Sequence, residues 1–121
     1  FMKKYITFPF ILRIGLAGVF LANSLMAFLA PSEFQELVSG SFVASILPVS
    51  VAIFVLFIGI NDLIVAVLLI SGWRTSRVAV YATAWLVGVI VVTGVFSLDA
   101  LEHLGFLAMA IALAVNGETK N

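Results

Sequence analysis

The sequence predicts an all-α membrane protein, a single transmembrane domain over residues 1–121 arranged as a four-transmembrane-helix up-down-up-down bundle. Two observations about composition and pattern carry this prediction. Of the 121 residues, 64% are hydrophobic and 10% are charged, whereas soluble domains are about half apolar and about a quarter charged. A soluble chain of this size has too little interior to bury so much apolar surface. The apolar residues also fall into four long segments that are joined by short connections.

The four expected spans follow from length, because about 20 residues at about 1.5 Å each cross roughly 30 Å of hydrocarbon. They cover residues 8–30, 48–71, 76–97 and 100–116. The first span follows two lysines, as a signal peptide does, but its apolar stretch is too long for one and contains Arg13. We therefore expect an uncleaved transmembrane helix.

Proline and glycine mark the expected helix ends. Pro31 stops the first helix, Pro48 fits a first turn, and Gly72 fits a C-terminal cap. Asn116 and Gly117 end the fourth helix in the same way. Since only "GWRTS" and "SLD" separate the last three spans, these helices must be antiparallel neighbours.

A short amphipathic outer helix is expected between the first two spans. Its segment "PSEFQELVSGSFVAS" opens with Ser32 and has Gln35 three residues later, which is the spacing of a capping box. Apolar residues follow at helical spacing, with Glu33, Glu36 and Ser39 opposite: Phe34, Leu37, Val38 and Phe42. The helix either lies on the outer surface or forms a lid over an outward-facing cavity.

The charges flanking the spans predict the orientation. Basic residues cluster at the two termini and the second connection: Lys3, Lys4, Arg74, Arg77 and Lys120. Acidic residues flank the first and third connections: Glu33, Glu36, Asp99 and Glu102. By the positive-inside rule, both termini are cytoplasmic, and the expected location is the plasma membrane of a bacterium or archaeon.

Two ionisable residues stand out well inside the expected spans, Arg13 in the first and Asp62 in the second. Each costs about 2.5–3.5 kcal/mol to insert unless it has a partner. Both share a helix face with small residues, which favours the bundle interior. We expect an intramembrane ion pair between them. It either fixes the helix register or lines a cavity that binds a polar head or relays a proton.

Further polar and aromatic residues are secondary candidates for a site. Asn61 points away from Asp62 and needs another partner. Asn23, Glu102 and His103 are expected near the outer side as a polar cluster, although Glu102 with Asp99 also fits an ordinary capping pair. Two aromatic residues of the third span are candidates to line a cavity: Tyr81 and Trp85.

Several function classes are excluded by composition and pattern. The chain has no cysteine, which excludes a disulfide, a redox dithiol, a thiolate nucleophile and a thiolate metal site. With one histidine and no cluster of potential ligands, no metal site is expected. There is no phosphate loop, no nucleophile–base pair and no nucleic-acid surface, so no catalytic residue is predicted.

Three stretches resemble the DoxX-like family of small four-helix membrane proteins: "RIGLAGVFLANSLMAFLAPSEF", "NDLIVAVLLISGWRTSR" and "EHLGFLAMAIALAV". Asp62 stands at the family's acidic position, while Glu102 and His103 replace the usual Arg-Asp and Met26 stands where a lysine is common. The resemblance implies a four-helix fold. It also implies a link to quinone-dependent oxidoreductase complexes, or to proteins that serve as cargo receptors or assembly chaperones.

Three functions follow as expectations. The first is a non-catalytic module that binds a hydrophobic ligand or a partner protein within the bilayer. The second is a membrane subunit of a quinone-linked oxidoreductase whose redox centres lie on a partner. The third is a small transporter or channel. No cofactor is evident, although quinone or lipid fits, and the alanine-rich fourth span suits contact with a second copy in a homo-oligomer.

Overall fold

The computed structural model describes the backbone of residues 8–93 and 98–116, and the side chains of residues 9–91 and 101–115. This part of the chain is entirely helical and contains no strand, as predicted from the sequence. The elements follow in the order α1 (Phe8–Leu29), α2 (Pro31–Ser39), the 3₁₀ helix η2 (Phe42–Ser45), α3 (Val51–Ser71), α4 (Thr75–Thr93) and α5 (Leu98–Asn116).

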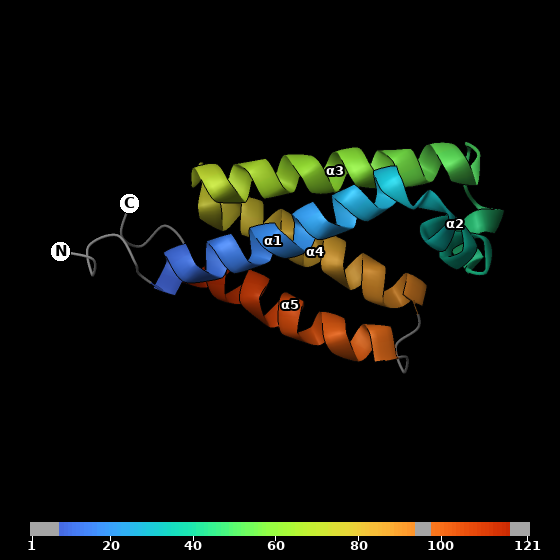
Figure 1. The fold of residues 1–121 in the computed structure, drawn as a ribbon. Helices are drawn as coiled ribbons and strands as arrows, with labels where there is room; N and C mark the ends of the chain where they lie inside the picture. Colours follow the sequence, from blue (N-terminus) through green and yellow to red (C-terminus); the bar gives the residue numbers. More distant parts are fainter. Residues whose placement is uncertain (1–7, 94–97, 117–121) are drawn as a thin grey trace.

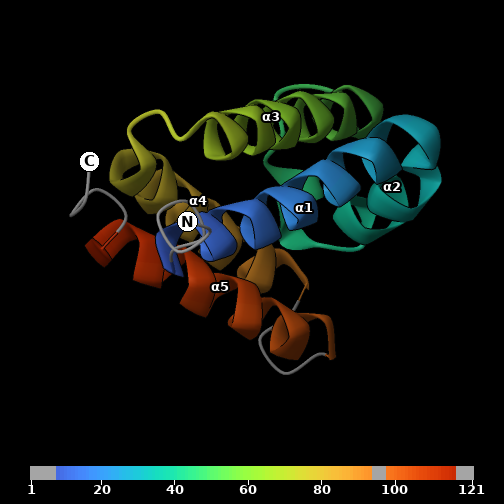
Figure 2. The same ribbon diagram turned by 60° about the vertical axis from the view of Figure 1, so that its left-hand side comes forward.

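The four long helices α1, α3, α4 and α5 lie side by side and alternate in direction (Figure 1). Helix α1 packs against α3 and α5, and α4 packs against α5 and α3. Figure 2 shows α1 between α3 and α5. Phe8 and Asn116 lie at the same end of the bundle, and α2 with η2 lies at the opposite end.

Two of the helices are long and apolar enough to cross a membrane, Pro9–Leu29 and Val51–Ser71. The apolar stretches of the other two long helices are shorter, Thr75–Val91 and Leu101–Val115. By length and composition, the described residues therefore contain two candidate membrane-spanning helices, and these indicate membrane association.

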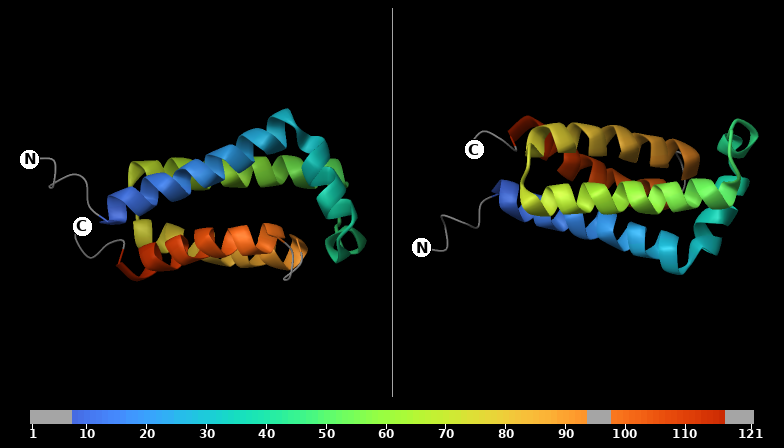
Figure 3. Two further views of the ribbon diagram at one scale, coloured as in Figure 1. Left: turned by 60° about the horizontal axis from the view of Figure 1, so that its bottom comes forward. Right: turned by 90° about the horizontal axis from the view of Figure 1, so that it is seen from above.

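The packed core fills the half of the bundle where α1 begins and α5 ends. All four long helices contribute to it: Leu16, Ala17, Phe20, Val65, Ala66, Leu69, Val78, Ala79, Ala82, Leu86, Ala110 and Leu113. Toward α2, helix α1 diverges from α5 (Figure 3). Side chains therefore fill one half of the bundle more completely than the other.

Helices α1 and α3 make the closest contact in the bundle. The Ser24 hydroxyl on α1 donates a hydrogen bond of 2.8 Å to the main-chain carbonyl of Gly59 on α3, and Ser24 is buried. A Cβ at position 59 would lie 2.9 Å from the ring of Phe28 and 3.2 Å from the Cβ of Ala27. Glycine at this position allows the two backbones to approach, as small residues do between membrane helices.

Helix α3 ends where the sequence predicts, but it begins at a different residue. Gly72 caps the helix in the left-handed region at φ 76°, and its N–H donates to the carbonyl of Leu68, which confirms the predicted C-cap. At the other end the helix begins at Val51, so Pro48 does not lie in its first turn. Ser50 is the N-cap because its hydroxyl accepts a hydrogen bond from the N–H of Ile53 at 3.2 Å.

Helix α2 also begins differently from the prediction. It starts at Pro31, whose fixed φ suits a first helical position, and Ala30 precedes it without any side-chain cap. The capping box expected from Ser32 is therefore not formed, since Ser32 already lies inside the helix. Phe42, expected on the same helix, belongs to η2.

The remaining predicted ends are only partly described. Helix α4 begins at Thr75 and is described to Thr93, so the expected continuation over 94–97 lies outside the described residues. Helix α5 begins at Leu98. The side chain of Asp99, an expected cap, and the expected C-cap Gly117 also lie outside them.

The left-handed cap gives the first testable prediction. Gly72→Ala is expected to lower the free energy of unfolding by about 1 kcal/mol, because alanine is strained at positive φ. The added Cβ would also lie 3.2 Å from the guanidinium of Arg13. Thermal unfolding in mild detergent measures the effect.

Gly105→Ala is the matched control. A Cβ at Gly105 meets nothing within 4 Å, and alanine is favoured over glycine inside a helix. We expect this variant to be at least as stable as the unsubstituted protein. Equal melting temperatures for the two variants would contradict the strained cap.

Candidate functional site

A cavity of about 950 Å³ occupies the half of the bundle nearest α2. Four long helices and α2 form its wall. The lining residues are Gly15, Gly18, Val19, Ala22, Asn23 and Met26 of α1, Glu33, Phe34, Leu37 and Val38 of α2, Phe54, Ile58 and Asp62 of α3, Ala84, Trp85, Gly88 and Val89 of α4, and Glu102, His103 and Phe106 of α5. Most of these side chains are apolar, and the polar ones are few.

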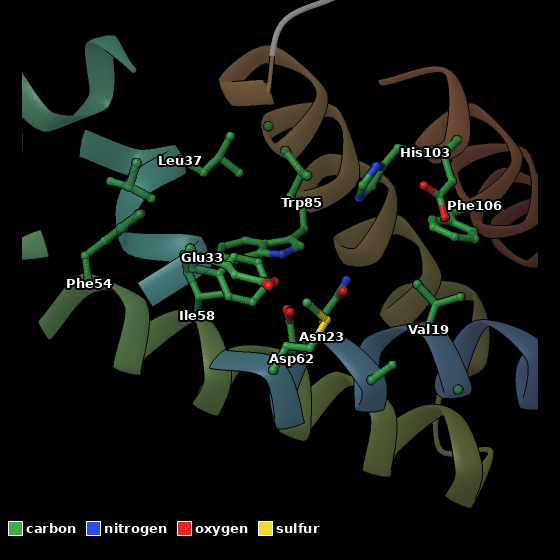
Figure 4. A pocket seen from close by; sticks show the side chains of 18 of the residues that line it. Val19, Asn23, Glu33, Leu37, Phe54, Ile58, Asp62, Trp85, His103 and Phe106 are labelled. Atoms are coloured by element: carbon green, nitrogen blue, oxygen red, sulfur yellow. The ribbon is translucent and has the colours of Figure 1, made fainter. Parts of the chain in front are cut away.

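Asp62 lies at the floor of this cavity, where the open half of the bundle meets the packed core. It is 2% exposed, and its carboxyl group points into the cavity beside Asn23 and Trp85 (Figure 4). The Asn61 amide donates to one of its oxygens at 3.1 Å. The indole N–H of Trp85 lies close enough to interact with the carboxyl group. The carboxyl group thus has two neutral polar neighbours.

Helix α2 covers the opposite end of the cavity. Glu33, Phe34, Leu37 and Val38 all line the wall, and Val38 is buried. Figure 4 shows Glu33 and Leu37 on one side of the cavity. Of the two sequence interpretations of this helix, the geometry matches the lid over a cavity.

The expected outer polar residues line this same cavity. Asn23 comes from α1, and Glu102 and His103 come from the start of α5. The His103 ring packs edge-on against Phe106, with ring centroids 5.4 Å apart. The structure therefore brings these three residues to the wall that also contains Asp62.

Arg13 does not reach Asp62. Its Nε donates to the main-chain carbonyl of Leu69 at 2.6 Å, and its Nη2 lies 3.4 Å from that of Ile70. The guanidinium also lies 5.5 Å from the centre of the Phe10 ring. Carbonyls in a last helical turn lack partners within the helix and carry partial negative charge, so a guanidinium there is stabilising. Contacts with the end of α3 replace the predicted Arg13–Asp62 ion pair.

The reason is the register between α1 and α3. Ser24 lies opposite Gly59 and Arg13 lies opposite Leu69. Asp62 precedes Leu69 by seven residues, or about 10 Å along a helix, which an arginine side chain does not bridge. The prediction placed the start of the first helix level with the end of the second. In the structure α1 begins about one turn beyond that level.

Tyr81 and Asn61 lie outside the cavity, in contrast to the expectation for Tyr81. Both line a surface groove between α3 and α4. The Tyr81 hydroxyl donates to the Asn61 side-chain oxygen, and the Tyr81 and Trp85 rings stack with centroids 6.4 Å apart. Tyr81 is one turn below Trp85 and so lies beneath the cavity floor. Tyr81 is the separate partner expected for Asn61, but the expectation that Asn61 points away from Asp62 is wrong, because its amide also donates to the Asp62 carboxyl group.

Sequence reasoning missed much of the cavity wall. Gly15, Gly18 and Ala22 form a small-residue stripe on α1 that also fits close helix packing. A Cβ at Gly18 or at Gly88 would meet nothing within 4 Å, so small residues at these positions leave space open. Phe54 and Phe106 were also missed, because nothing in so apolar a sequence distinguishes a phenylalanine that lines a cavity from one that does not.

The arrangement offers hydrogen bonding and charge within an apolar container. Among the described residues, no group of three or more histidine, aspartate or glutamate side chains is placed to hold a metal ion. Carboxyl groups, an amide, an imidazole and an indole N–H face the cavity. They can orient the polar end of a ligand whose body contacts the apolar wall.

The separation of Arg13 from Asp62 gives a second prediction. Arg13→Gln is expected to lower stability by about 1–2 kcal/mol, because the charged donors to the end of α3 are lost. In a double-mutant cycle with Asp62→Asn, the two effects should add within about 0.5 kcal/mol. Chemical unfolding in mild detergent measures each variant. A coupling energy above about 1 kcal/mol between the two substitutions would indicate that Arg13 and Asp62 form an ion pair after all. Arg13→Lys, which keeps the charge, is the control.

A comparison with known protein families, curated proteins and solved structures finds no match. The resemblance to the DoxX-like family therefore stays a prediction from the quoted motifs. The function is inferred from the cavity and the residues that face it.

Proposed function

We propose that this chain is a four-span membrane module, DoxX-like in fold, that holds a hydrophobic ligand in the cavity beneath α2. It performs no catalysis on its own. One observation carries the proposal. A cavity of about 950 Å³, near the upper end of the usual range for small-molecule sites, lies inside a bundle whose outer surface is also apolar.

The outer surface supports four spans rather than two. Every exposed side chain of α3 from Ala52 to Ile70 is apolar, and this stretch is about 27 Å long. The other helices expose large apolar side chains as well, among them Ile11, Leu25, Val80, Val87, Leu104 and Ile111. Soluble monomers rarely expose so continuous an apolar surface, whereas lipid covers it at no cost.

The charges support the proposed orientation. Arg74 and Arg77 lie at the end of the bundle where α3 passes into α4, and Glu33 and Glu36 lie on α2 at the other end. The positive-inside rule then places Phe8 and Asn116 on the cytoplasmic side. The cavity lies in the outer half of the membrane, with α2 as its outer cover.

The wall explains how a ligand would be held. The apolar body packs against residues such as Phe54, Ile58 and Phe106, which gains van der Waals contact. The polar end reaches the floor, where Asp62 accepts hydrogen bonds and Asn23 both donates and accepts. Entry requires α2 to move or the ligand to pass between the diverging helices α1 and α5.

A quinone held for a partner redox protein is the second candidate. Trp85 and Asn23 are hydrogen-bond donors at the floor, and quinone carbonyls are acceptors. Asp62 and His103 line the same wall. In this function the redox centres belong to the partner.

The four-span topology gives a third prediction. The sequence has no cysteine, so Ser39→Cys on α2 and Ser71→Cys at the end of α3 each introduce a single thiol at an exposed position. In right-side-out vesicles, a membrane-impermeant maleimide is expected to label position 39 and to spare position 71 until the membrane is permeabilised. Labelling of both positions from outside would contradict the topology.

Blocking the cavity gives a fourth prediction. Gly88→Leu adds a side chain where a Cβ meets open space on the cavity wall. We expect native mass spectrometry in mild detergent to show a retained lipid-like or quinone adduct on the unsubstituted protein. This adduct should decrease by about tenfold or more in the variant, since several ligand contacts are lost at once.

Gly105→Leu is the matched control for the blocked cavity. A Cβ at Gly105 also meets nothing within 4 Å, but this residue does not line the cavity. The control variant should keep its adduct. Equal adduct levels on both variants would place the ligand elsewhere on the protein, and the mass of the adduct separates a lipid from a quinone.

A further inference from the structure

The cavity wall carries three acidic residues beside the imidazole of His103. Glu33 of α2, Asp62 of α3 and Glu102 of α5 line it from three different helices. Among the described lining residues there is no lysine or arginine. Acidic groups in an apolar cavity act on a ligand's charge more strongly than they would in water.

Asp62 lies deepest among these acidic groups and has only neutral donors. Asn61 and Trp85 contact its carboxyl group, and Asp62 is 2% exposed. The basic residue expected beside it, Arg13, is held by the end of α3 instead. Burying a carboxylate without a countercharge is costly. A positively charged ligand would supply this countercharge.

Aromatic side chains from four helices also line the cavity wall. Trp85 stands over the floor, Phe34 comes from the lid, and Phe54 and Phe106 come from α3 and α5. The faces of aromatic rings attract cations, and tryptophan does so most strongly. Acidic and aromatic groups around one apolar space are suited to a cation whose charge is surrounded by hydrocarbon.

We propose that the cavity selects lipophilic cations, such as hydrophobic amines or quaternary onium ions, over neutral and anionic molecules of the same size. This inference rests on the proposed function, because it names the ligand class of the same cavity. The cationic centre lies near Asp62 and the ring of Trp85, and the apolar substituents fill the space under α2. Glu33 and Glu102 attract the cation to the entrance.

Two probes of equal shape and opposite charge test the inference. Tetraphenylphosphonium and tetraphenylborate each carry four phenyl rings around one charged centre, and tetraphenylphosphonium is the cation. Binding to the full chain in an uncharged detergent is measured by equilibrium dialysis. We expect the cation to bind at least about tenfold more tightly, the ratio that about 1.4 kcal/mol of charge selectivity gives.

Charge-removing variants locate the selectivity. Asp62→Asn should weaken binding of the cation by about tenfold or more, and it should weaken binding of tetraphenylmethane, a neutral probe of the same shape that forms no hydrogen bond, by a much smaller factor. Glu33→Gln should weaken it by a smaller factor, because Glu33 lines the lid end of the cavity. Glu36→Gln is the control, since Glu36 lies on the same helix but does not line the cavity. If Asp62→Asn does not fold, the comparison of Glu33→Gln with Glu36→Gln still tests the proposal.

The outcomes separate this inference from the proposed function. Equal binding of the two charged probes, or equal loss in the Glu33 and Glu36 variants, would overturn the selectivity for cations. A neutral probe that binds and is excluded by Gly88→Leu would then still support a ligand-binding cavity. Failure of all three probes to bind would overturn both proposals.

Discussion

The contact between α1 and α3 determines where the polar residues of this molecule lie. The hydrogen bond from Ser24 to the Gly59 carbonyl fixes the register near one end of the pair, and Arg13 fixes it at the other by donating to Leu69. In both hydrogen bonds a side chain of α1 donates to a main-chain carbonyl of α3. The register therefore does not require a polar side chain on α3. Once these bonds form, Asp62 lies between them, three residues from Gly59 and seven from Leu69.

The divergence of α1 from α5 divides the bundle into a packed half and an open half. Leu16, Phe20, Leu69 and Leu113 fill the space between the helices at one end, whereas Gly18 and Gly88 leave it open toward α2. A bundle packed along its whole length would be more stable, because each void forfeits dispersion contacts. The packed half therefore supports the open one, and α2 covers an end that would otherwise be exposed.

The sequence predicted the helices but not the register between them, and part of its polar candidates line the cavity. Gly72 has a local signature, and its cap is where the pattern placed it. Asp62, Asn23 and His103 were chosen because polar groups are costly among apolar ones, and all three line the cavity. The ion pair with Arg13 could not be assessed from depth alone, because an offset of one helical turn depends on packing between Ser24 and Gly59. The cavity itself depends on helix divergence, for which an apolar sequence gives no local signal.

Arg13 and Asp62 therefore have separate places in the fold. Arg13 neutralises the end of α3 and holds α1 against it, so its charge is used within the fold. Asp62 contributes no such connection between helices α1 and α3. Its neighbours Asn61 and Trp85 are neutral and supply no countercharge to the carboxyl group. An ion pair between Arg13 and Asp62 would have joined α1 to α3 and neutralised the carboxyl group at the floor of the cavity. By pairing Arg13 with main-chain carbonyls, the fold leaves a carboxyl group facing an apolar space, and recognition of a ligand is the role this placement allows.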